Sequence, residues 1–202
     1  RRKSLYFLLA TIFFLFMGYN AIMSKIADYM PKVLNLNFFD YQFIIAQVLV
    51  LLCIVPIGIL STYLGRKNTI LIGISLLTIS FGSVYFIPEG QPWLTAGVVA
   101  VAGMGWSMIS INTYVMVVEL AKVLDVGRYT GYYYAASMTA QIITPILSGY
   151  FMDNHELKRL TLFPYATIFV FIAIITMLFV KQGEAKIIKK DLLELFHIEG
   201  DD

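Results

Sequence analysis

Residues 4–24 read SLYFLLATIFFLFMGYNAIMS and contain no Asp, Glu, Lys or Arg. Five more stretches without a charged residue follow, at 41–65, 68–88, 90–118, 129–152 and 160–180. Each exceeds the roughly 18 apolar residues that predict a helix across a bilayer core of about 30 Å. We therefore predict an all-α integral membrane protein with six transmembrane helices, at 4–30, 41–61, 68–87, 93–118, 129–152 and 162–180. These form one bundle over residues 1–180, followed by a tail at 181–202.

The composition argues against most other classes of protein. Hydrophobic residues make up 59% of the 202 residues and charged residues 14%, whereas soluble domains carry about 25% charged residues. The basic residues flank the apolar segments, so we expect a bilayer and no nucleic acid as partner. Cys53 lies within an apolar segment, and His155 and His197 lie in a loop and the tail. We therefore expect no metal, no cofactor and no catalytic residues.

The basic residues also predict an orientation. One side of the proposed membrane carries Arg1, Arg2, Lys3, Arg66, Lys67, Lys122, Arg128, Lys181, Lys186, Lys189 and Lys190. The other side carries Lys32, Lys158 and Arg159. The positive-inside rule then places both termini in the cytoplasm, and we expect a multi-pass protein of the plasma membrane. In the tail, apolar residues at 188, 192, 195 and 196 suggest either a helix lying on the inner leaflet or a frayed terminus.

Two helices carry stripes with helical spacing. The segment 93–118 has small residues, which favour close helix packing: Ala96, Ala100, Gly103, Ser107 and Ser110. The segment 129–152 has polar residues, namely Thr130, Tyr134, Ser137, Gln141, Thr144 and Ser148. Since hydroxyl and amide groups find no partner in lipid, we expect this second stripe to face a wet cavity or another part of the protein.

The first helix ends on charged residues. Asn20, Ser24 and Asp28 share one face, and Lys25 lies beside it, near the expected outer boundary of the membrane. Lys25 can extend to the lipid headgroups and pair with Asp28, at little cost. Alternatively, Lys25 and Asp28 form an extracellular gate at the mouth of a water-filled pathway.

Residues 58–70, GILSTYLGRKNTI, resemble the loop signature of the major facilitator superfamily, Gly-x-Leu-x-Asp-Arg-x-Gly-Arg-Lys/Arg. Gly58, Leu60, Gly65, Arg66 and Lys67 match this signature. Thr62 and Tyr63 stand at the positions of its Asp and first Arg, so the usual charge pair is absent. This departure fits the second copy of the signature.

Residues 105–153, together with 16–21 and 162–183, resemble glycoside–pentoside–hexuronide:cation symporters and sucrose–proton symporter-like bacterial carriers. The resemblance implies the C-terminal half of a twelve-helix carrier, built from two inverted three-helix repeats. PIGIL at 56–60 and PILSG at 145–149 each have a proline followed within four residues by a glycine, a weak similarity that agrees with such a repeat. The chain begins at Arg1 without a methionine, and we expect the N-terminal six-helix half to be its missing partner.

The implied function is secondary active transport, by symport of a sugar or glycoside with H+ or Na+. Residues expected to bind the substrate are Tyr19, Asn20, Ser24, Trp106, Ser110, Asn112, Tyr134, Ser137 and Gln141. The resemblance also implies an inner latch of Arg66, Glu119 and Arg128, unless these are ordinary solvated loop charges. Other open interpretations are a half-size homodimeric transporter of another small solute and a non-transporting membrane sensor or assembly protein.

Overall fold

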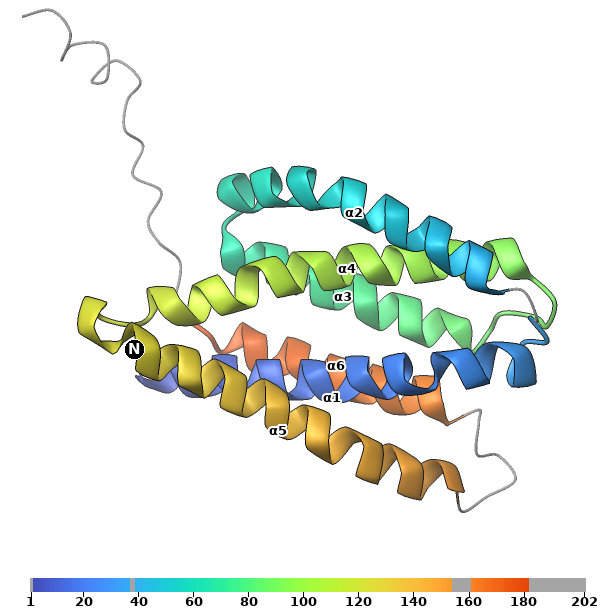
Figure 1. Cartoon of the computed structure of the whole chain (residues 1–202). Coiled ribbons are helices and arrows are strands. Elements are labelled where there is room, and N and C mark those ends of the chain that lie inside the picture. The colour runs from blue at the N-terminus through green and yellow to red at the C-terminus, as the bar shows by residue number, and fades with distance from the viewer. Residues whose placement is uncertain (1, 37–38, 154–160, 182–202) are drawn as a thin grey trace, which may run out of the picture.

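The computed structural model describes residues 2–36, 39–153 and 161–181, in which six α-helices lie side by side (Figure 1). They are α1 (Arg2–Val33), α2 (Phe39–Leu64), α3 (Arg66–Val84), α4 (Pro92–Glu119), α5 (Val126–Asp153) and α6 (Leu162–Leu178), and a 3-10 turn, η1 (Val123–Asp125), joins α4 to α5. The described residues contain no β-strand. Each predicted segment lies on one helix, and the two sets of ends differ by about three residues at most.

Consecutive helices run in opposite directions, so the turns gather at two ends of the bundle (Figure 1). The start of α1, the α2–α3 turn, η1 and the end of α6 lie at one end, which we call the basic end because it carries Arg2, Lys3, Arg66, Lys67 and Arg128. There the Lys181 N–H donates to Ser4 Oγ at 3.3 Å. The opposite end, called the far end here, carries Lys25, Asp28 and Lys32, and there the Gly90 N–H donates to the Leu34 carbonyl at 2.9 Å.

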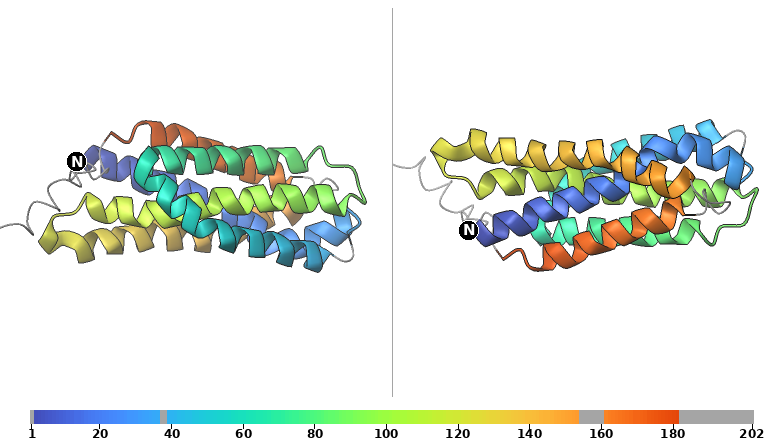
Figure 2. Two further views of the ribbon diagram at one scale, coloured as in Figure 1. Left: turned by 90° about the horizontal axis from the view of Figure 1, so that it is seen from above. Right: turned by 90° about the horizontal axis from the view of Figure 1, so that it is seen from below.

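The helix packing repeats itself when α1–α3 are exchanged for α4–α6. Helix α1 lies between α5 and α6, and α4 lies between α2 and α3 in the equivalent way (Figure 2). Helix α3 packs against α6, which joins the two three-helix groups. Because α3 starts at the basic end and α6 starts at the far end, the two groups cross the bundle in opposite directions.

Small residues set the closest helix crossings. A Cβ added at Gly105 of α4 would lie 2.7 Å from the Gly73 carbonyl oxygen of α3, and one added at Gly73 would lie 2.7 Å from the Gly105 carbonyl oxygen. At Gly18 of α1 the added Cβ would lie 2.6 Å from Val170 Cγ2 of α6. Such close approach of backbones is how helices gain packing energy in lipid, where no hydrophobic effect drives them together.

Among the described residues, four helical segments are long and apolar enough to cross a membrane: α1, residues 43–64 of α2, α3 and α4. Helix α6 is apolar but has 17 residues, and α5 does not meet the same measure. Both α2 and α5 expose apolar side chains along much of their length, including Leu52 and Val55 on α2 and Ile142 and Ile146 on α5. Exposed apolar surface of this extent is typical of contact with lipid or with another protein surface.

Candidate functional site

Tyr19 of α1 and Trp106 of α4 stack face to face near the middle of both helices. Their ring centroids lie 3.5 Å apart and their planes differ by 2°. Phe16, on the preceding turn of α1, meets Trp106 edge-on with centroids 5.3 Å apart. Helices α1 and α4 touch little elsewhere, so this aromatic cluster is their principal contact across the centre of the bundle.

A short repeat in the sequence places the two rings. Met17-Gly18-Tyr19 on α1 corresponds to Met104-Gly105-Trp106 on α4. Gly18 packs against α6 and Gly105 packs against α3. The aromatic residue that follows each glycine contacts its counterpart on the other helix, so that Tyr19 meets Trp106. The sequence prediction named Tyr19 and Trp106 separately but missed this repeat, which was the available signal for their pairing.

Asn20 follows Tyr19 on α1, and its side chain is half-buried. The amide nitrogen Nδ2 is shielded from solvent and has no hydrogen-bond partner among the described residues. An unpaired buried donor costs about 1–3 kcal/mol compared with a satisfied one. This donor is therefore free to pair with an oxygen atom of a ligand only once the atoms that cover it move aside.

Four more of the predicted substrate-binding residues are exposed in this structure. They are Ser24 on α1, Ser110 on α4, and Tyr134 and Gln141 on α5. Ser24 and Ser110 donate to backbone carbonyls of their own helices, at 3.1 and 3.3 Å. Tyr134 contacts Tyr114 of α4, with ring centroids 6.4 Å apart.

Two predicted substrate-binding residues are buried within the bundle instead. Ser137 is 2% exposed and donates to the Tyr134 carbonyl. Farther along α5, Thr144 is also buried and donates to Met17 Sδ of α1 at 3.3 Å, so this side of the polar stripe packs against α1 rather than facing water. Asn112 is 0% exposed and shares a helix face with Gly105, which contacts α3, and its Nδ2 donates to the Met108 carbonyl. Neither side chain is open to a solute here.

The small-residue stripe of α4 packs against α2 at its centre. A Cβ added at Gly103 would lie 2.4 Å from Val50 Cγ2 of α2. Ala100 and Ser107, on the same face, are buried. Close packing, one of the functions expected of this stripe, accounts for these three positions, whereas Ser110 at its end is exposed.

At the far end, the Asp28 carboxylate forms an ion pair with Lys32, one turn later on α1. Both side chains are about half exposed, so the pair lies in a solvated position. Lys25 is half-buried. Asp28 thus pairs with Lys32, which was not part of the predicted gate, and the gate of Lys25 and Asp28 stays a prediction.

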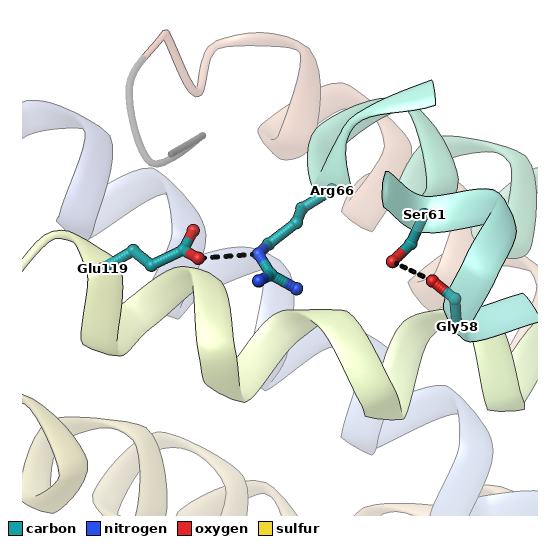
Figure 3. Close-up of polar contacts among 4 residues, drawn as sticks. All are labelled: Gly58, Ser61, Arg66 and Glu119. Carbon is teal, nitrogen blue, oxygen red and sulfur yellow. Dashed lines mark hydrogen bonds and ion pairs between the residues drawn. The ribbon is translucent and has the colours of Figure 1, made fainter. Parts of the chain in front are cut away.

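The turn between α2 and α3, at the basic end, consists of a single residue, Gly65. Its φ of 83° is in the left-handed region, which costs other residues about 1–2 kcal/mol. The next two residues contact different helices. Arg66 Nε donates to Glu119 Oε1 of α4 at 2.8 Å (Figure 3). Lys67 Nζ donates to the Val180 carbonyl at 2.5 Å and the Leu178 carbonyl at 3.3 Å, at the end of α6.

The predicted latch of three residues has two of its members in contact. Arg66 and Glu119 form an ion pair in which the side chains are 31% and 20% exposed. Arg128 instead pairs with Asp125 of η1 at 3.4 Å, close by in sequence. Glu119 Oε2 is buried without a hydrogen-bond partner among the described residues. The carbonyl of Gly58, also in the predicted signature, accepts a hydrogen bond from Ser61 at 3.0 Å (Figure 3). A Cβ added at Gly58 has no atom within 4 Å, so this glycine serves no close packing within the described residues.

The site combines aromatic surface, an unpaired amide donor and exposed hydroxyl groups. Within the described residues, no three His, Cys, Asp or Glu side chains are grouped as a metal site. These groups can hold a polar solute with an apolar face, and the ion pairs at the two ends can change partners if the helices move.

The family model of the Major Facilitator Superfamily matches residues 7–190. The chain belongs to the Major Facilitator Superfamily. No curated protein matches its sequence. Superfamily members are transporters, so this chain is a multi-pass membrane protein of the transport class and, at the level of the family, not an enzyme.

Superfamily membership gives a context to the turn between α2 and α3. The structure gives a role to three residues of the signature. Gly65 forms the left-handed turn, Arg66 contacts α4 and Lys67 contacts the end of α6. At the two departures from the signature, Thr62 donates to the Ile59 carbonyl of its own helix and Tyr63 is exposed. The end of the turn that matches the signature thus holds α3 to its neighbours within the bundle.

Proposed function

We propose that the chain is the C-terminal six-helix half of a twelve-helix carrier that transports a sugar or glycoside together with H+ or Na+. The observation that carries this proposal is the Tyr19–Trp106 stack with the unpaired Nδ2 of Asn20 beside it. Sugars bind through hydroxyl hydrogen bonds and through the apolar face of the ring, which packs on aromatic side chains. Ser24, Ser110, Tyr134 and Gln141 would supply further polar contacts from the exposed face.

The proposal includes α5 and α6 as membrane-spanning helices. Polar residues lower the hydropathy of α5, and a helix between a bundle and a wet cavity needs such residues on one side. The exposed apolar side chains of α2 and α5 fit contact with the N-terminal half or with lipid. Alternating access would then be rocking of this bundle against its partner around the central site.

The charged contacts support a role for the basic end in this rocking. In our proposal the basic end faces the cytoplasm, as the distribution of Lys and Arg predicts. The Arg66–Glu119 pair holds the inner end of α4 to α3 in one state and separates in another. Glu119 Oε2 is buried without a partner among the described residues, so it could accept from a second cation once the helix ends move apart. Since no span has an acidic residue near its centre, the coupling carboxylate would lie in the partner half.

The decisive experiment is counterflow in proteoliposomes with the full protein that contains this chain. Labelled sugars and glycosides are tested with and without a proton or sodium gradient. Exchange of at least one sugar, accelerated by one gradient, is the expected result. Trp106→Phe should weaken exchange, whereas the control Trp93→Phe, at the exposed start of α4, should leave it unchanged. Failure to exchange any sugar would refute the substrate class and favour a non-transporting sensor or an assembly protein.

The same preparation tests the half-size alternative. A twelve-helix carrier places this chain and the N-terminal half in one polypeptide, which can be active as a monomer. A half-size protein would need a second copy of this chain to cover α2 and α5. Cross-linking between cysteines on two copies of α5, in active membranes, would favour the homodimer.

A further inference from the structure

A pocket of about 40 Å³ lies beside the aromatic stack and is lined by residues of α1, α2, α3, α4 and α6. Tyr19 forms part of its wall, so the pocket adjoins the proposed solute site directly. Met23 also lines it and is 40% exposed, which places an edge of the pocket at the surface of the chain. The pocket is thus reached from the surface beside Met23, one turn after Tyr19 on α1.

The lining of this pocket is apolar. Apart from Tyr19 and Gln47, every lining residue has an aliphatic, aromatic or thioether side chain or is glycine. Phe43 of α2, Phe81 of α3 and Phe163 of α6 are among them. Such a surface offers a bound water molecule too few hydrogen-bond partners, whereas an apolar group gains by leaving water for it.

The volume limits what can enter. A cavity needs roughly 10–15 Å³ to hold a single water molecule, and an apolar cavity that binds benzene has about 150 Å³. At about 40 Å³, the pocket has room for a methyl to isopropyl group.

We propose that this pocket is a subsite for a small alkyl substituent of the transported solute. The inference rests on the proposed function, since the hydroxyl-bearing part of the same solute is held at Asn20 and the aromatic stack. The solute class is therefore a short-chain alkyl glycoside, or a sugar with a comparable apolar group, rather than a sugar that is polar throughout.

The test compares each sugar with its alkyl glycoside in proteoliposomes of the full protein. The pairs are D-galactose with isopropyl β-D-thiogalactoside, D-glucose with methyl β-D-glucoside, and D-xylose with methyl β-D-xyloside. Burying one methyl or methylene group is worth about fourfold in affinity. For the sugar that is recognised, half-saturation of counterflow by the alkyl glycoside should therefore occur at a concentration about fourfold lower, or less.

Variants of α4 locate the effect. Ala102 lines the pocket, and Ala102→Leu places three carbon atoms in it. This variant should abolish the advantage of the alkyl glycoside and leave half-saturation by the free sugar unchanged. Ala96→Leu makes the same change on α4 outside the lining and should keep the advantage. Ala102→Val, with two added carbon atoms, gives a smaller version of the effect should the leucine variant fold poorly.

The outcomes separate the two proposals. Exchange of a free sugar with no advantage for its alkyl glycoside overturns the subsite while the proposed function stands, and this is the result expected if a lipid chain fills the pocket. An advantage that survives Ala102→Leu and Ala102→Val also overturns it. If neither free sugars nor alkyl glycosides exchange, both the subsite and the proposed function fail.

Discussion

Replacing Gly105 by alanine should destabilise the bundle, although alanine is the better helix former. A Cβ at this position would lie 2.7 Å from the Gly73 carbonyl oxygen and 3.2 Å from the Leu77 backbone nitrogen. Both atoms belong to the backbone of α3 and cannot rotate away. Since ordinary contacts of a Cβ begin at 3.4 Å, α3 and α4 would have to move apart by about 0.7 Å.

The magnitude follows from two opposing terms. Overpacking of this kind costs about 1–3 kcal/mol. Alanine in place of glycine within a helix contributes about 1 kcal/mol of stability in return. Gly97, on the same helix, has no atom within 4 Å of its added Cβ, so Gly97→Ala has the second term alone. Gly105→Ala should therefore be less stable than Gly97→Ala by about 1–3 kcal/mol.

The assay is unfolding of the purified full protein in detergent, by heat or by added dodecyl sulfate, followed by circular dichroism. Equal stability of Gly97→Ala and Gly105→Ala would refute the close crossing. The double variant Gly73→Ala/Gly105→Ala adds a second check. Because either extra Cβ separates the same two helices, its destabilisation should be smaller than the sum of the two single effects.

Three further variants test other contacts. Glu119→Gln should remove the ion pair with Arg66 and cost about 1 kcal/mol of stability. It should also raise the reactivity of cysteines placed at the inner end of α4, whereas the control Arg128→Gln should not. Unchanged transport and unchanged cysteine reactivity in Glu119→Gln would exclude the latch. Gly65→Ala should cost about 1–2 kcal/mol because of the positive φ, measured by the same unfolding assay, and a neutral result would mean that the turn has another shape. Lys67→Met should speed hydrogen exchange at the last turn of α6, where its ammonium group binds two carbonyls, and unchanged exchange there would mean that the cap contributes nothing.

The helices could be predicted from the sequence because charges interrupt it at regular intervals. The six helices predicted from these charge-free segments end within about three residues of the helices of the structure. The inward side of each helix was harder to predict. In lipid, the face that packs on other helices is as apolar as the face that meets acyl chains, so hydropathy does not separate them. Asn112 shows the difficulty, because an amide was expected to face a cavity and is buried instead.

The candidate site was predicted in part. Tyr19, Asn20 and Trp106 were all named from the sequence, but their mutual arrangement depends on which helices cross. The polar stripe of α5 was read as one face, but Thr144 contacts Met17 of α1 and Ser137 is buried, whereas Gln141 is exposed. Gln141 lies about 40–60° around the helix axis from Ser137 and Thr144, so the stripe straddles the border between the buried and the exposed side of α5.

The repeated Met-Gly-aromatic sequence has a consequence for how a solute can lie in the centre of the bundle. The residue after each aromatic ring occupies an equivalent place, Asn20 in one copy and Ser107 in the other. Ser107 already donates to the Gly103 carbonyl, while the Asn20 amide has a hydrogen to spare. If the solute binds Asn20 as we propose, a solute turned end over end would lose that hydrogen bond. The two copies of the repeat therefore place equivalent groups on α1 and α4, and the Asn20 amide alone distinguishes the two orientations of a solute between them.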